Sequence, residues 1–296
     1  MSLGSILLSP ASLAATALFR TYGSNEPLAR KIAAIFIPAA LRPLKRRRRA
    51  NFANFFGPLP DGQLDELEKR YIRYHLDFIA SWARLLIKTP AALKEQLTID
   101  GEAHIREALR GGRGALLLMS HAGFPGEVGT ALAASGHSLT VIANRLPLEA
   151  VNTLFETLGE RFGIEILWRG AETPLQVREA YGRNRLVVAL HDVVLSQKNA
   201  ERVPFGKGTI QADLGTPVIA LRHAVPVLRV THRREAGRLR ITIGEPSTLH
   251  RTGDPRDDAR QAMALWMRQL GEEIADSPAE WWAWSFVELG HRTGGS

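Results

Sequence analysis

The sequence predicts an α/β protein with a mixed, mostly parallel central sheet flanked by helices, and with a helical region at the N-terminus. After Pro90, short runs rich in branched residues alternate with segments of helical periodicity, a pattern typical of parallel strands joined by crossover helices. Ala236-Gly237, between the last two runs, indicates a hairpin turn and therefore an antiparallel pair at one edge. We therefore expect a helical N-terminal region over residues 1–90 and an α/β core over residues 91–296.

The expected elements follow from the spacing of the apolar residues. Large apolar residues recur at three- and four-residue steps from Gln63 to Lys88, which predicts one long amphipathic helix. The expected strands are Leu97–Asp100, Ala115–Met119, Leu139–Ala143, Ile164–Leu167, Leu186–Leu190, Pro226–His232 and Leu239–Gly244. The helices expected in the core are Gly126–Ala134, Leu148–Phe162, Glu172–Gly182, Pro255–Ala275 and Ser277–Leu289.

Composition and charge limit the classes of function. The 296 residues include no cysteine, which excludes disulfides, thiolate nucleophiles and cysteinyl zinc sites. The formal net charge of +8 favours an acidic partner: nucleic acid, an anionic lipid surface or an acidic carrier protein. His191-Asp192 together with His121 matches no metal-binding spacing, so no metal is expected.

The N-terminal region carries features of a membrane-surface segment. Leu3 to Phe19 is apolar but short and interrupted by Pro10, so it makes a poor membrane span. Ile32 to Leu41 is apolar as well, and the basic run Lys45–Arg49 follows it. Apolar residues beside a basic cluster suit an anionic bilayer surface, whereas a solvated basic helix face or a nucleic-acid patch are the alternatives. The basic run has few aromatic neighbours for base stacking, so nucleic acid is the least favoured partner.

The residues best placed for chemistry follow the strand Ala115–Met119. Polar side chains at the carboxyl end of a strand in such a sheet lie where ligands usually bind, and His121 stands there. Histidine accepts protons near neutral pH, and a carboxylate on its second ring nitrogen fixes the tautomer. Glu127 is the acid nearest in sequence.

Six blocks, in order, resemble the late lipid A acyltransferases of the lysophospholipid acyltransferase-like superfamily. Ser120-His121 with Glu127 resembles that family's histidine-plus-acid block. The other blocks are Asn144-Arg145, Leu158–Ile164, Leu186–Leu190 followed by His191-Asp192, Val203–Gly206 followed by Thr209, and Glu280–Trp284.

The resemblance implies an acyltransferase that moves a fatty acyl group from an acyl carrier protein or coenzyme A thioester to a lipid A-like glycolipid or another lipid acceptor. It implies His121 as general base and Glu127 as its acid, with no cofactor. It further implies amides near Gly123 or at the start of the following helix for the oxyanion, and substrate contacts from Arg145, Asp192 and, more weakly, Thr209. A peripheral monomer at the cytoplasmic face of the inner membrane is the expected setting.

The spacing of the catalytic block departs from the family pattern, which has four residues between the histidine and the acid. Here five residues intervene, among them Gly123, Pro125 and Gly126. Either these residues form a local bulge that brings Glu127 back to His121, or another acid, or none, serves the histidine. An acyltransferase acting on a specialised metabolite and a non-catalytic acyl- or lipid-binding relative stay open as alternatives.

Overall fold

A computed structural model describes residues 21–22, 25–194, 200–235 and 238–291. A seven-stranded sheet has the strand order β1-β9-β8-β2-β5-β3-β4, and a three-stranded sheet has the order β10-β7-β6. In the large sheet every neighbouring pair is parallel except β8 with β9. The prediction of a mixed, mostly parallel sheet flanked by helices is confirmed. The predicted hairpin turn and the apolar segment Leu3–Phe19 lie outside the described residues.

The strands of the large sheet lie within a few residues of their predicted bounds. They are β1 (Leu97–Asp100), β2 (Ala115–Met119), β3 (Leu139–Ala143), β4 (Glu165–Trp168), β5 (Leu186–Leu190), β8 (Val227–Glu235) and β9 (Arg238–Ile243). The small sheet, which the sequence analysis did not predict, consists of β6 (Ala200–Phe205), β7 (Gly208–Asp213) and β10 (Gly290–His291). Every residue of β2 is buried, as a central parallel strand requires.

Alternate residues of β2 point into two different cores. Leu116 and Leu118 pack with residues of α10 (Thr173–Gly182), α11 (Gly215–His223) and α12 (Pro255–Asp276) on one face. Leu117 and Met119 pack with residues of the helices on the other face, which are α7 (Glu102–Leu109), α8 (Pro125–Ala134) and α9 (Glu149–Phe162). The period of two along the strand thus produces a three-layer arrangement.

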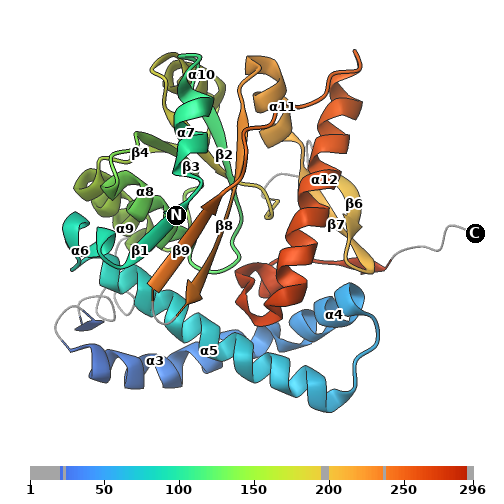
Figure 1. The fold of residues 1–296 in the computed structure, drawn as a ribbon. Coiled ribbons are helices and arrows are strands. Elements are labelled where there is room, and N and C mark those ends of the chain that lie inside the picture. The colour runs from blue at the N-terminus through green and yellow to red at the C-terminus, as the bar shows by residue number, and fades with distance from the viewer. Residues whose placement is uncertain (1–20, 23–24, 195–199, 236–237, 292–296) are drawn as a thin grey trace, which may run out of the picture.

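Three N-terminal helices lie beneath the sheet. They are α3 (Glu26–Leu41), α4 (Lys45–Phe56) and α5 (Asp61–Leu85), shown in blue to cyan at the bottom of Figure 1, below the end of β8. A short helix, α6 (Pro90–Lys94), leads from them into β1. Because the end of β8 points toward α5, these helices lie next to the carboxyl ends of the parallel strands. No helix of the described part of the chain is both long and apolar enough to cross a bilayer.

The basic run Lys45–Arg49 has two different roles in the structure. Arg48 is buried and donates to Glu68 over 2.5 and 2.9 Å and to Ser285 over 2.9 Å, with its guanidinium 4.8 Å from the centre of the Tyr71 ring. Arg49 pairs with Asp61 and Asp65. Lys45, Arg46 and Arg47 are exposed. The run is therefore partly a structural clamp between helices and partly a charged surface.

The segment after α12 differs from its prediction. One helix was expected over Ser277–Leu289, but the structure has two short 3-10 helices, Pro278–Glu280 and Trp282–Ser285, separated by an extended Trp281. Trp281 forms an antiparallel bridge with Ala122, next to His121. Pairing with the β2–α8 loop outcompetes helix formation here, and it brings the C-terminal segment to the expected site.

Candidate active site

His121 and Asp192 come from the ends of two neighbouring strands. Met119, the last residue of β2, pairs with Leu190, the last residue of the parallel strand β5. Both His121 and Asp192 follow two residues later, so the register places them side by side. The Nδ1 atom of His121 lies 2.9 Å from Oδ1 of Asp192, and the backbone N–H of His121 donates to Oδ2 over 2.9 Å. This histidine–aspartate dyad lies where ligands bind in parallel α/β sheets.

The environment of the dyad sets its protonation. The side chain of Asp192 is fully buried, whereas that of His121 is 29% exposed. Burial alone would raise the pKa of Asp192, but the adjacent His121 and the hydrogen bonds from His121 and Trp281 outweigh it and lower the pKa to about 2. An ionised Asp192 accepts a hydrogen bond from Nδ1–H of His121, which leaves Nε2 with its lone pair, as a general base requires.

Three hydrogen bonds hold the loop that carries His121. The N–H of Trp282 donates to the carbonyl of His121 over 3.2 Å, and the N–H of Gly123 donates to the carbonyl of Glu280 over 2.8 Å. The hydroxyl of Tyr74, on α5, donates to the carbonyl of Gly123 over 2.6 Å. These bonds use the C-terminal segment and the N-terminal helices to fix a loop of the sheet.

Gly123 and His232 complete the support of this loop. The N–H of Phe124 donates to Nε2 of His232 over 2.5 Å. Burial, followed by the nearby charge of Arg234, lowers the pKa of His232 to about 4, so the ring is neutral and its Nε2 can accept. Gly123 has a φ of +65°, and a Cβ there would lie 2.4 Å from that Nε2. Only glycine fits this position.

The expected role of Gly123 as an oxyanion donor needs correction. Its N–H already donates to Glu280, and the N–H of Phe124 donates to His232. Both amides therefore hold the loop in place instead of facing a substrate.

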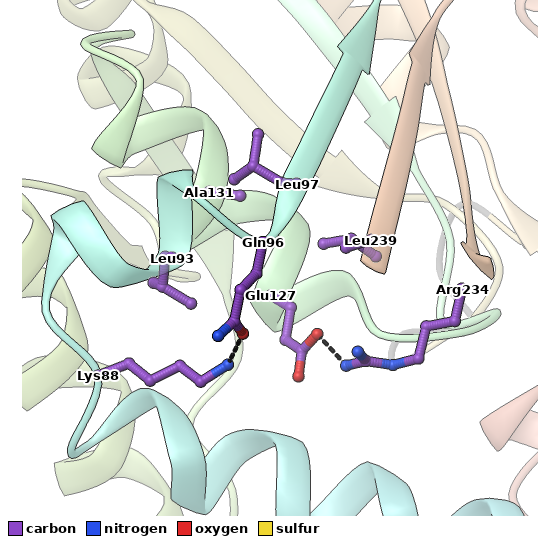
Figure 2. A pocket seen from close by; sticks show the side chains of 8 residues that line it. All are labelled: Lys88, Leu93, Gln96, Leu97, Glu127, Ala131, Arg234 and Leu239. Atoms are coloured by element: carbon purple, nitrogen blue, oxygen red, sulfur yellow. Dashed lines mark hydrogen bonds and ion pairs between the residues drawn. The ribbon is translucent and has the colours of Figure 1, made fainter. Parts of the chain in front are cut away.

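Glu127 is not the acid that His121 contacts. It is the third residue of α8, and its carboxylate forms ion pairs with Arg234 and, at 3.8 Å, with Arg84. Figure 2 shows Glu127 and Arg234 pointing toward one another across a pocket of about 20 Å³, enough for about one water molecule. The glycine turn at Gly123 and the helix start at Pro125 direct the side chain of Glu127 toward α5 and the end of β8. The loop forms no bulge that would return this side chain to His121.

The other expected substrate contacts lie apart from the dyad. Arg145 follows β3, stacks on Trp168 with its guanidinium 4.6 Å from the ring centre, and pairs with Glu156 at 3.5 Å and Glu149 at 4.0 Å. Thr209 lies on β7 and accepts a hydrogen bond from Arg202 over 3.1 Å.

A second hollow, with a volume of about 360 Å³, is lined by residues of β6, β7 and the C-terminal segment together with Arg47 and Val194. Two of its lining residues connect it to the site. Val194 follows Asp192 by two residues, and Phe286 stacks on Trp282, whose ring centre is 5.3 Å from that of His121. Arg202, which Thr209 contacts, lines the same hollow. The hollow is thus connected to His121 through the stacked rings of Trp282 and Phe286, and neither His121 nor Asp192 is among its lining residues.

Three residues of the site were not anticipated from the sequence. Trp281 was noted only as part of the block Glu280–Trp284, and neither His232 nor Tyr74 was assigned a role in the site, yet each of the three makes a polar contact with the His121 loop or with Asp192. Their partners are between 49 and 108 residues away in the chain, so no local pattern signals them. For Asp192 a signal exists, since it follows its strand by the same two residues as His121.

A three-layer α/β fold with a histidine–aspartate dyad at the carboxyl ends of its central strands defines an enzyme of acid–base chemistry. A family model described as bacterial lipid A biosynthesis acyltransferase matches residues 22–284. The chain belongs to this family, which confirms the resemblance found in its sequence.

A curated relative is named as an acyltransferase. The chain is 30% identical over 168 residues to phosphatidylinositol mannoside acyltransferase of Mycolicibacterium smegmatis, and the match covers 54% of each chain. The chain thus spans about half the length of the curated relative that it matches.

Proposed function

We propose that the protein transfers a fatty acyl group from an acyl carrier protein or coenzyme A thioester to a hydroxyl, or an amine, of a lipid A-like glycolipid or another lipid acceptor. The similarity to a phosphatidylinositol mannoside acyltransferase adds phosphatidylinositol mannosides to the acceptors worth testing. The observation that carries the proposal is the 2.9 Å contact between His121 and Asp192 in a member of this family.

The reaction proceeds in one displacement. Nε2 of His121 takes the proton of the acceptor hydroxyl as its oxygen attacks the thioester carbonyl. Asp192 stays ionised and stabilises the imidazolium that forms. As the tetrahedral intermediate collapses, the carbon–sulfur bond breaks and the thiolate takes the proton from Nε2. The products are an ester and a free thiol, and the reaction needs neither an acyl-enzyme nor a cofactor.

The test follows thiol release from acyl-coenzyme A and acyl carrier protein thioesters, with lipid A precursors and phosphatidylinositol mannosides as acceptors. Wild-type protein is expected to release thiol in step with acylated lipid, and His121→Ala to lose this activity. Full activity in His121→Ala would reject the histidine as base. Binding of acylated lipid without any turnover by the wild type would instead favour a non-catalytic lipid-binding relative, and turnover only with small polar acceptors would favour a specialised metabolite.

We further propose that the outer face of α3 rests on an anionic bilayer, at the cytoplasmic side of the inner membrane. Ala29, Ala33 and Ile37 form the buried face of this helix. Outside this face Ile35 and Phe36 are 71% and 65% exposed, and the exposed Lys45, Arg46 and Arg47 follow on α4. Exposed apolar side chains beside exposed basic ones match a bilayer interface with anionic lipid.

Sedimentation with vesicles tests this orientation. The protein is expected to bind vesicles that contain phosphatidylglycerol more strongly than vesicles of phosphatidylcholine alone. Ile35→Glu/Phe36→Glu is expected to weaken binding, whereas Leu175→Glu, at an exposed position of α10, leaves it unchanged. Undiminished binding of the double variant would exclude this face, and stronger binding to duplex DNA or RNA than to vesicles would favour a nucleic-acid partner.

A further inference from the structure

The carboxylate of Asp192 has a hydrogen-bond donor that the proposed mechanism does not use. Oδ1 faces Nδ1 of His121, while Oδ2 accepts the backbone N–H of His121 and, over 2.7 Å, the indole N–H of Trp281. A buried carboxylate with donors on both oxygens has one orientation, and charge-assisted bonds of this kind are roughly twice as strong as neutral ones.

Trp281 is itself held rigidly. It is completely buried. Its ring meets the ring of Trp284 edge-on, with ring centres 4.8 Å apart, and contacts the tilted ring of Phe205, with ring centres 5.2 Å apart. Its backbone is fixed by the bridge to Ala122. The indole therefore cannot turn away from Asp192 without disrupting this aromatic cluster, so it transmits the position of the C-terminal segment to the dyad.

We propose that Trp281 is a positioning residue of the dyad, whose indole N–H fixes the Asp192 carboxylate and disperses part of its negative charge. This inference rests on the proposed role of His121 as base. With the N–H present, Asp192 holds the histidine ring in place without holding its proton too strongly. Without the indole N–H, Oδ2 of Asp192 loses its side-chain donor, and His121 alone shares the negative charge of the carboxylate.

Trp281→Phe tests the inference, and Trp284→Phe is its matched control. Trp284 lies three residues away and is equally buried, but its indole N–H donates over 2.6 Å to the carbonyl of Pro278 instead of to the dyad. We expect Trp281→Phe to lower kcat/KM about tenfold or more. We also expect the acid limb of its pH profile to move to higher pH, because the undispersed charge of Asp192 holds the proton on His121 more tightly.

The control separates positioning from packing. Trp284→Phe is expected to lower stability but to leave the acid limb where it is in the wild type, and the same profile for both variants would overturn the inference. His121→Ala is measured in parallel. If His121→Ala is inactive and the two tryptophan variants match, only the role of Trp281 is rejected, whereas an active His121→Ala rejects the base and Trp281 together.

A second substitution tests the same inference if Trp281→Phe does not fold. Site-specific incorporation of 3-benzothienylalanine at position 281 keeps the shape of the bicyclic ring and replaces the N–H by sulfur. The same shift of the acid limb is expected, and an unchanged profile would overturn the inference. The same replacement at position 284 supplies the matched control.

Discussion

Replacing Asp192 by Asn is the sharpest test of the assignment of the acid. At the observed 2.9 Å, the attraction between the carboxylate and an imidazolium is about 6 kcal/mol with an effective dielectric constant of about 20. Asparagine keeps a dipole and hence part of this attraction. The loss of transition-state stabilisation should be about 3–5 kcal/mol, which lowers kcat by about 10²- to 10⁴-fold.

Glu127→Gln makes the same chemical change at the acid that follows His121 in sequence. Because Glu127 pairs with Arg84 and Arg234, its loss should lower the free energy of unfolding by about 1–2 kcal/mol and leave kcat within about threefold of the wild type. The assay is thiol release at saturating substrate, with thermal unfolding as the check on folded protein. A hundredfold loss in Glu127→Gln with a small loss in Asp192→Asn would refute the assignment.

Three further predictions concern the supports of the site and of the N-terminal helices. Gly123→Ala should lower the free energy of unfolding by about 2 kcal/mol or more and reduce activity, because its Cβ would lie 2.4 Å from Nε2 of His232. Gly112→Ala is the control, because Gly112 has a φ of +67° but no described atom beyond its chain neighbours lies within 4 Å of the added Cβ, so only the smaller cost of backbone strain is expected. Equal losses of stability in the two variants, measured by chemical denaturation, would contradict a clash with His232. Burial lowers the pKa of His232 from 6.5 to about 4, so its contribution to stability is complete above about pH 6.5 and is lost as the pH falls toward 4. His232→Gln keeps an acceptor for Phe124 but cannot be protonated, so unfolding free energies measured across this window should fall by roughly 3 kcal/mol less than in the wild type, and parallel curves would reject the effect. Arg48→Met should lower the free energy of unfolding in urea by about 3–5 kcal/mol, because Glu68 is left buried without its partner. The double variant with Glu68→Leu should recover part of this stability, and a double variant that shows the sum of the two single losses would contradict the reasoning.

The sequence was sufficient for the large sheet because its signals are local. Leu186–Leu190 is a short branched run between helical patterns, and its bounds in the structure are those predicted. The small sheet was missed because β6 has the polar residues Glu201 and Arg202 near its start and contains Pro204, which argues against a strand. A signal was present in β7, where the buried Ile210 and Ala212 alternate with polar residues after the turn at Gly206.

The site was predictable only in part, for a different physical reason. His121 could be found because it lies two residues beyond a buried strand, in a block that resembles the family's histidine block. Its acid could not be chosen by proximity in the chain, since Asp192 is 71 residues away and depends on the register of β2 with β5. Trp281 is a further 89 residues from Asp192, and its contact requires the docking of a segment that a helical pattern had concealed.

The pairing of Trp281 with Ala122 has a consequence for the order of events during synthesis. Of the large sheet, only β8 and β9 lie beyond residue 223, and the helices up to α11 end by that point. The segment that closes on the His121 loop is made later still, after α12. Contacts between segments so far apart form late in folding, since the intervening loops must close first. A nascent chain with a nearly complete sheet therefore still lacks a fixed dyad, and the site is complete only when the segment that carries Trp281 has docked.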